Sequence, residues 1–342
     1  MNPNNFREWL TQAGREIGAH SVACLRMDNP RLRRTIADNN IQVSAWLQNE
    51  MHGEMEYLER MFPEKSNPWN TYPFAKSVIV LSFNNLWGDP AAKHPFPEPA
   101  KDALLGYISA YAREDDYHFI GQAMLSKLTS MLGENIRAAA TVDTAAVYER
   151  LFATVAGLGV VGGNSLLRVS GSGNTRVFIG CLFVDIELPE VIHEAQMPFA
   201  CATCHACVKN CPTGAIQVDQ PIDARKCISY LTIEKRGPLS QAEGRSIGRW
   251  LFGCDGCTLA CPPRPKTDMR IPIDLEWLLQ SSAAEIRRTI KGNATAYAGV
   301  TQLRRNAVVI LKNMETRRAQ EVLRWTRENS GSELIRQQID LW

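Results

Sequence analysis

The sequence predicts an α+β protein with three consecutive parts, and three observations indicate this division. Helix-like and strand-like apolar patterns alternate up to residue 188, eight of the ten cysteines fall between residues 201 and 261, and short helical patterns follow residue 272. We therefore expect an α/β domain over residues 1–195, a cysteine-rich module over 196–271 and a helical segment over 272–342. With 342 residues, of which 45% are apolar, the chain can bury sizeable cores.

The elements of the first part follow from the spacing of its apolar residues. The stretch "SVIVLSF" (77–83) is a β-branched run after Pro73 and predicts a strand. The same reasoning, in chain order, predicts helices over residues 4–18, 42–62, 101–133 and 145–157, and further strands over 138–144 and 176–188. The stretch "GLGVVG" (157–162) matches the dinucleotide fingerprint G-x-G-x-x-G, but a helix-like stretch precedes it and no helix pattern follows, so we expect no Rossmann site.

The cysteine-rich module contains a ferredoxin pattern almost twice. "CATCHACVKNCP" (201–212) reads C-x2-C-x2-C-x3-C-P, the run that binds iron–sulfur clusters in bacterial ferredoxins. "CDGCTLACP" (254–262) repeats it without the leading cysteine, and Cys227 stands upstream as the missing member. CxxC pairs also bind zinc, so two zinc sites are the alternative, but the repeated spacing favours two [4Fe–4S] clusters.

In such a run the fourth cysteine ligates the other cluster. The predicted ligands of one cluster are therefore Cys201, Cys204, Cys207 and Cys261, and those of the other are Cys211, Cys227, Cys254 and Cys257. Cys24 and Cys181 lie outside the pattern and are expected to be buried core thiols. Two adjacent clusters carry electrons, so we expect an external low-potential donor and an internal acceptor.

The helical segment has an unusual charge balance. Residues 287–342 hold eleven Lys and Arg against five Asp and Glu, whereas the whole chain has a net charge of +2. A basic segment on an otherwise mildly acidic body suggests an anionic partner, and solvated surface helices are the alternative. On the helix expected over 301–314, Leu303, Ala307 and Ile310 form an apolar face, with Arg304 and Arg305 away from it.

The sequence also indicates where the protein works. Its N-terminus has charges spread along an amphipathic helix pattern and does not resemble a secretory signal, and no apolar run approaches eighteen residues. We therefore expect a cytoplasmic protein, without membrane contact, that works as a monomer. In that compartment ten cysteines are not expected to form disulfides.

Several stretches, in the same order along the chain, resemble the epoxyqueuosine reductase family. They are "GEMEYLER" (53–60), "PFAKSVIVL" (73–81), "YAREDDYH" (111–118), "VDT" (142–144), "ERLFATVAGLGVVGGNSLL" (149–167), "CPTGAI" (211–216), "ARKCISYLTIEKRGP" (224–238), "FGCDGCTLACP" (252–262) and "LRRNAVVILKN" (303–313). The resemblance implies an N-terminal domain that holds cobalamin, a two-[4Fe–4S] ferredoxin-like module and a HEAT-like helical domain that binds tRNA. The family's reaction converts epoxyqueuosine to queuosine at the wobble position of tRNA.

The resemblance also implies roles for individual residues. Asp143, in "VDT", corresponds to the family's proton donor and would need a raised pKa; the alternative is a helix cap near Thr144. The residues that fall where the family lines its cobalamin pocket are Lys65, His118, Asp143, Gly162, Gly163, Asn164, Ser165 and Ser229. The expected tRNA contacts are Lys235, Arg304 and Arg305, and the basic segment adds Arg317 and Arg318.

The chain departs from the family on the cobalamin and substrate side. Ala145 and Ala146 replace the Gly-Pro of "VDTGP", and Gly163 stands where the family has lysine in "GWIGKN". Cys181 takes an acidic position, and Lys65 replaces an arginine. These changes leave a divergent paralogue possible: a corrinoid iron–sulfur reductase of a small molecule, or a non-catalytic corrinoid or electron-transfer protein, are the alternatives to the tRNA reductase.

Overall fold

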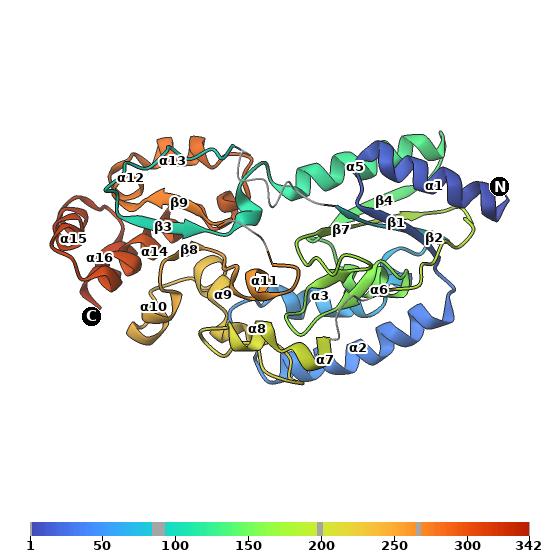
Figure 1. Ribbon diagram of the computed structural model, residues 1–342, viewed down its shortest axis with the longest axis horizontal. Coiled ribbons are helices and arrows are strands. Elements are labelled where there is room, and N and C mark those ends of the chain that lie inside the picture. Colours follow the sequence, from blue (N-terminus) through green and yellow to red (C-terminus); the bar gives the residue numbers. More distant parts are fainter. Residues whose placement is uncertain (1, 84–92, 197–200, 265–267, 342) are drawn as a thin grey trace.

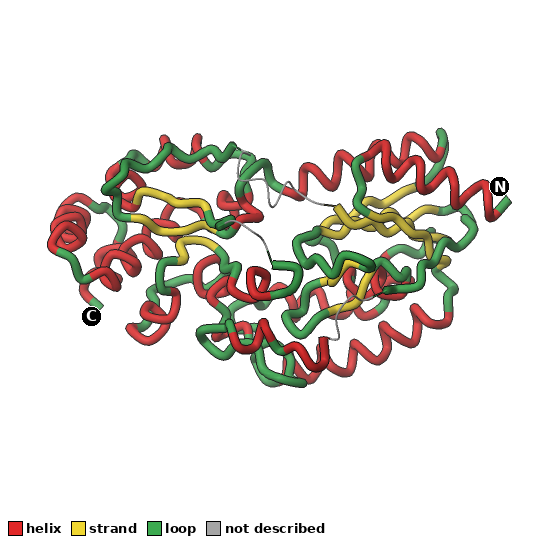
Figure 2. Tube along the Cα trace, in the orientation of Figure 1, coloured by secondary structure: helices red, strands yellow, loops and turns green. Residues whose placement is uncertain are grey.

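The computed structural model describes residues 2–83, 93–196, 201–264 and 268–341. Figure 1 shows two lobes side by side, one that contains the N-terminus and one that contains the C-terminus. Both lobes combine helices with a small sheet (Figure 2), as the α+β prediction requires.

The N-terminal lobe is built on a four-stranded antiparallel sheet in the order β1-β2-β7-β4. Its strands are β1 (Ser21–Arg26), β2 (Ser77–Phe83), β7 (Phe178–Val184) and β4 (Ala138–Val142). Every residue of β2 is buried. Ile79, Leu81 and Phe83 belong to one core, and the alternate residues Val78 and Val80 belong to the other. This two-residue alternation explains why a continuous apolar run forms a central strand.

Helices cover both faces of this sheet (Figure 1). Helices α1 (Pro3–Ile17) and α5 (Tyr117–Leu132) pack on one face, and α2 (Pro30–Gln48) and α6 (Glu149–Val155) on the other. The predicted strand over 77–83 and the first predicted helix are confirmed.

The single helix expected over residues 42–62 is wrong. α2 ends at Gln48, and α3 (Tyr57–Ser66) begins after a turn and precedes the short α4 (Pro68–Thr71). In that turn Gly53 has φ +62°, and a Cβ there would come within 2.4 Å of the Tyr230 hydroxyl. A contact with a residue distant in sequence therefore sets the break.

The stretch "GLGVVG" leads into a hairpin. β5 (Gly159–Val161) pairs antiparallel with β6 (Leu167–Val169), so a strand and a turn follow where a dinucleotide site needs a helix. The expectation that this is not a Rossmann fingerprint is confirmed.

The C-terminal lobe contains a strand that the sequence analysis missed. β3 (Leu105–Ile108) pairs parallel with β8 (Trp250–Phe252) and antiparallel with β9 (Ile271–Asp274). Residues 101–133 therefore do not form one helix: β3 and a 3-10 turn, η1 (Ala110–Ala112), precede α5. One core contains apolar residues from β3, the cysteine-rich module and the terminal helices. The cysteine-rich module and the terminal helices thus share one core.

The remaining elements are short helices, apart from two longer ones near the C-terminus. In the cysteine-rich module they are α7 (Cys201–Cys204), α8 (Ala206–Lys209), η2 (Ala224–Lys226), α9 (Ile228–Ile233), α10 (Gln241–Ile247) and α11 (Gly256–Ala260). After β9 they are α12 (Leu275–Gln280), α13 (Ala283–Thr289), η3 (Ala294–Tyr297), α14 (Gly299–Met314), α15 (Arg317–Asn329) and α16 (Glu333–Asp340). α14 is the hub of this lobe, since α9, α10, α12, α13, α15, α16 and β8 all pack against it.

The burial of α14 corrects one prediction. Arg305 was expected on an exposed face, but its relative exposure is 0%. Its guanidinium donates to the carbonyl oxygens of Leu231, Lys235 and Gly237 at 2.6–2.9 Å, and to Asn306 Oδ1. Burial lowers the pKa of Arg305 to about 10. This arginine satisfies the backbone around the end of α9 and is not available to a phosphate.

No helix among the described residues is both long and apolar enough to cross a membrane.

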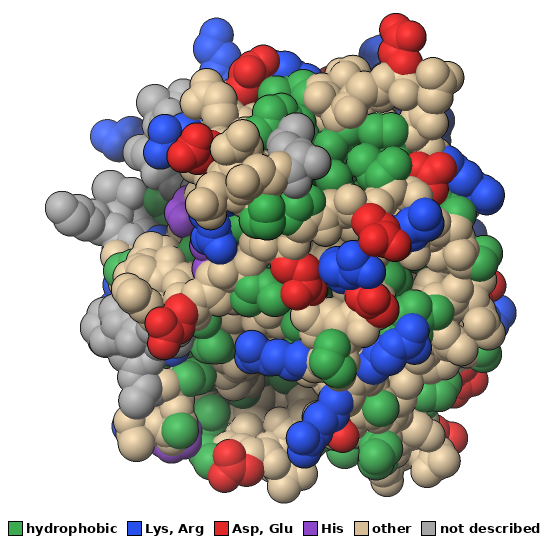
Figure 3. Space-filling view, turned by 90° about the vertical axis from the view of Figure 1, so that its right-hand side faces the viewer, with side chains coloured by type: hydrophobic (Ala, Val, Ile, Leu, Met, Phe, Trp, Pro, Cys, Tyr) green, Lys and Arg blue, Asp and Glu red, His purple; other side chains and the backbone are tan. Residues whose placement is uncertain are grey.

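On the end of the N-terminal lobe that Figure 3 presents, cationic and anionic side chains are mixed, so this face offers no surface of a single charge sign to an anionic partner.

Candidate redox and substrate site

Asp143 lies immediately after β4, with a left-handed backbone (φ +58°). It does not cap a helix, because α6 begins six residues later, at Glu149. Its Oδ2 accepts a 2.5 Å hydrogen bond from the Tyr117 hydroxyl and lies 3.6 Å from His118 Nε2. The side chain is 64% exposed. The structure therefore contradicts the capping role and presents the carboxylate at the surface of a site.

The start of α5 holds the partners of Asp143 in place. Asp116 caps α5 by accepting from the His118 backbone N–H, and the same oxygen lies 2.7 Å from His118 Nδ1. The Tyr117 ring stacks between His118, at 4.1 Å, and Phe178 of β7, at 3.9 Å between ring centroids. A carboxylate, an imidazole and a second carboxylate are thus aligned on a rigid support.

Among Asp116, His118 and Asp143, His118 is the residue that carries the proton. Burial lowers the pKa of His118, but the two flanking carboxylates outweigh it and raise this pKa to about 9. Burial raises the pKa of Asp143, yet the ion pair with His118 and the hydrogen bond from Tyr117 bring it below the usual carboxyl value. The expected raised pKa of Asp143 is therefore wrong, since an imidazolium and a phenol stabilise its charged form.

Further charged residues lie behind Asp143 on α6 and α3. Lys65 donates to the carbonyl of Val147 at 3.4 Å and also lowers the pKa of Asp143. Arg150 donates to the carbonyl of Ser165, and burial raises the pKa of Glu149 to about 7. Sequence reasoning did not single out Glu149 or Arg150. The available signal was a pair of charges at the start of an otherwise apolar helix.

Several buried polar atoms around Asp143 lack a hydrogen-bond partner within the described part of the chain. They are His118 Nε2, Tyr148 Oη, Glu149 Oε1 and Asn164 Nδ2. Buried polar groups are normally paired. These atoms therefore fit a bound group that is rich in hydrogen-bonding atoms.

The turn between β5 and β6 connects this region to the cysteines. The turn closes through Ser165 N–H donating to the Gly162 carbonyl at 2.9 Å, and Gly163 N–H donates to Cys201 Sγ at 3.4 Å. The turn is thus held by Arg150 at Ser165 and contacts the first thiols at Gly163. Ser229 lies in α9, two residues after Cys227.

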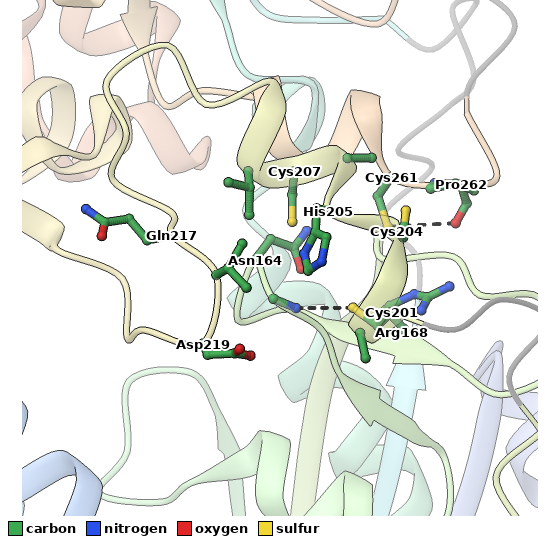
Figure 4. Close-up of a pocket in the computed structure, with 15 residues that line it drawn as sticks. Asn164, Arg168, Cys201, Cys204, His205, Cys207, Gln217, Asp219, Cys261 and Pro262 are labelled. Carbon is green, nitrogen blue, oxygen red and sulfur yellow. Dashed lines mark hydrogen bonds between the residues drawn. The ribbon is translucent and has the colours of Figure 1, made fainter.

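Figure 4 shows a pocket lined by thiols, the β5–β6 turn and His205. We define the first thiol group as Cys201, Cys204, Cys207 and Cys261. Burial raises the pKa of Cys207 and of Cys261, and the neighbouring thiols of this group raise both pKa values further. We call Cys211, Cys227, Cys254 and Cys257 the second thiol group, and the same pattern holds for Cys227, Cys254 and Cys257. Cys207 also acts on Cys257, so the groups are neighbours. Thiols of each group thus interact with others of the same group, and the assignment of the two sets to two clusters stays a prediction. Cys24 and Cys181 are buried, as expected.

Two of the expected tRNA contacts are engaged within the protein, in addition to Arg305. Lys235 Nζ lies 2.6 Å from Glu243 Oε1. Arg304 donates to the carbonyls of Leu278 and Ser281. Arg318 is paired with Asp102 and Glu276, whereas the side chain of Arg317 is 93% exposed.

Comparisons with known proteins agree with this geometry. The family model described as epoxyqueuosine reductase QueG matches residues 65–144, and that of a 4Fe-4S double cluster binding domain matches residues 200–264. The epoxyqueuosine reductase of Salmonella typhimurium is 33% identical over 92% of this chain and 81% of its own length. That of Pseudomonas aeruginosa is 31% identical over 99% and 94%.

Solved structures share the fold. Epoxyqueuosine reductase from Streptococcus thermophilus aligns with a TM-score of 0.80 at 22% identity, covering 98% of this chain and 88% of that one. An epoxyqueuosine reductase crystallised with an epoxyqueuosine-modified tRNA-Tyr stem loop aligns equally well, over 99% and 89%. The extent of these matches confirms the resemblance: the chain belongs to the epoxyqueuosine reductase family and carries a 4Fe–4S cluster binding domain.

Proposed function

We propose that this protein reduces epoxyqueuosine to queuosine in tRNA. The observation that carries the proposal is the alignment of Asp116, His118 and Asp143 on a rigid support, next to a turn that touches the first thiol group. Removing the epoxide oxygen as water consumes two electrons and two protons. The thiol groups mark the electron route, and the aligned acids mark the proton route.

The residues present fit two [4Fe–4S] clusters and a cobalamin. We propose that the first and second thiol groups each ligate one cluster, because the expected motifs supply four cysteines to each group and thiols within each group interact. Cobalamin would lie between the β5–β6 turn and Asp143, where the unpaired polar atoms of Tyr148, Glu149 and Asn164 could bind its polar side chains. When bound, cobalamin would supply a strongly reducing centre that receives electrons from the clusters.

His118 and Asp143 would handle the proton. At neutral pH His118 is an imidazolium whose Nε2 lies 3.6 Å from Asp143 Oδ2, and Asp143 presents its exposed carboxylate to the site. Asp143 would take up the proton of His118 and pass it to the departing oxygen. Asp116 holds the imidazole ring in the orientation that this transfer needs.

The tRNA surface needs a different set of cations from the one expected. Arg287, Arg288 and Lys291 are exposed at and after the end of α13. The next residue, Gly292, accepts a 2.8 Å hydrogen bond from the N–H of Asp116. The segment that carries these cations is therefore hydrogen-bonded to Asp116, which holds His118 in place. We propose that the cations contact tRNA phosphates.

Nucleoside analysis of tRNA from a deletion strain tests the proposal: epoxyqueuosine should accumulate and queuosine should disappear. Unchanged queuosine would favour the alternative, a corrinoid iron–sulfur reductase of a small molecule, which the substitutions at Ala145, Ala146 and Gly163 favour. We further propose that the protein works in the cytoplasm as a monomer, with an external low-potential electron donor.

A further inference from the structure

A buried arginine faces the first thiol group. Arg168 lies on β6, opposite Val160 of β5, and its relative exposure is 2%. Its stem runs beside Gly162, where an added Cβ would lie 3.1 Å from Arg168 Cδ. Its side chain lines the thiol pocket, and Figure 4 shows it next to Cys201. A strand position between the buried Leu167 and Val169 thus holds a cation beside the cysteines.

The β5–β6 turn offers a second position beside the thiols. Gly163 lines the same pocket as Arg168. A Cβ added to Gly163 would lie 3.6 Å from Cys207 Sγ, an ordinary contact distance, so a lysine there would extend from beside the thiols. A cation introduced at position 163 could therefore stand in for Arg168.

A second arginine near these thiols is less informative. Arg176 interacts electrostatically with both Cys261 and the buried carboxyl of Asp255. Arg168 is the residue to test, because it lines the thiol pocket, whereas Arg176 is not among the lining residues.

We propose that Arg168 raises the reduction potential of the cluster bound by the first thiol group. Reduction adds one electron to a cluster that four thiolates already make anionic. A buried cation stabilises that extra negative charge, because the surrounding protein screens it less than water would. The inference rests on the proposed cluster ligation.

The test is a redox titration of the reconstituted full-length protein, followed by electron paramagnetic resonance. Arg168→Gln removes the charge and should lower the equilibrium constant for reduction of this cluster about tenfold, which is about 59 mV for a one-electron couple. Arg168→Lys should keep the potential near that of the wild type. Arg317→Gln, at a 93% exposed position, is the matched control and should change neither cluster.

The double variant Arg168→Gln, Gly163→Lys is the decisive rescue. A cation restored from position 163 should return the potential towards the wild-type value. Iron-loaded Arg168→Gln with unchanged potentials would overturn the proposal, as would an iron loss that Gly163→Lys does not repair, since Arg168 would then serve packing alone. A wild-type protein that binds no iron would instead refute the cluster assignment itself.

Discussion

Replacing Asp116 with asparagine should shift the pH dependence of the reaction. Asparagine keeps an oxygen that can cap α5, so the helix should still form. It removes one of the two carboxylates that raise the pKa of His118 to about 9. A hydrogen bond to a charged partner contributes about 1.5–3 kcal/mol, and one pKa unit corresponds to about 1.4 kcal/mol. We therefore expect the pKa of His118 to fall by about 1–2 units.

The consequence depends on pH in a defined direction. At pH 8.5 about three quarters of wild-type His118 would be protonated, but only about 3–24% in the variant, so turnover should fall by about three- to 25-fold. At pH 6.5 most of the histidine is protonated in both proteins, and turnover should differ by less than about twofold. The assay is single-turnover reduction of epoxyqueuosine-containing tRNA across this pH range.

Asp115→Asn, at an exposed neighbouring position, is the control and should leave the profile unchanged. An Asp116→Asn profile that superimposes on that of the wild type would refute the assignment of the proton to His118.

The folding stability of the protein should also decrease as the pH rises and His118 loses its proton. Because the folded pKa of His118 is raised, its stabilisation is complete below about pH 6.5 and is lost as the pH rises through about 9.

Three further predictions concern other parts of the molecule. Arg305→Met should destabilise the protein by at least about 3 kcal/mol in chemical denaturation, since it removes the hydrogen bonds to the carbonyls of Leu231 and Gly237 and to Asn306 Oδ1; a loss below about 1 kcal/mol would contradict this. Arg287→Ala with Arg288→Ala should lower the log–log salt slope of tRNA binding by about two units, and an unchanged slope would place the tRNA elsewhere. Cys204→Ala should lose one cluster in iron analysis, and full iron content would exclude Cys204 as a ligand.

The sequence predicted elements whose formation depends on local pattern. The β-branched run over 77–83 and the apolar periodicity of residues 301–314 are visible without knowledge of the fold, and they became β2 and α14. β3 was missed because its partners, β8 and β9, lie more than 140 residues away. Pairing with them overrides the helical periodicity of its four residues.

In the candidate site, too, some features follow from the local sequence and others depend on contacts between distant segments. Cysteine spacing specified two sets of thiols, because ligand geometry is encoded over a few residues. The protonation of His118 could not be predicted, because it depends on Asp143, 25 residues away, which meets Tyr117 only when β4 packs against α5. Arg305 looked like a surface cation because the carbonyls that bury it belong to residues 231–237.

The central claim is that this protein removes the epoxide oxygen with Asp143 passing the proton of His118 to that oxygen. Asp143→Asn in an anaerobic assay with epoxyqueuosine-containing tRNA, cobalamin and a low-potential donor tests it most directly. Asparagine keeps the shape but cannot take up a proton from His118 and pass it on, so turnover should fall by about 10²–10⁴-fold, with iron content and tRNA affinity unchanged. Wild-type turnover by this variant, or no formation of queuosine by the wild-type protein, would contradict the account.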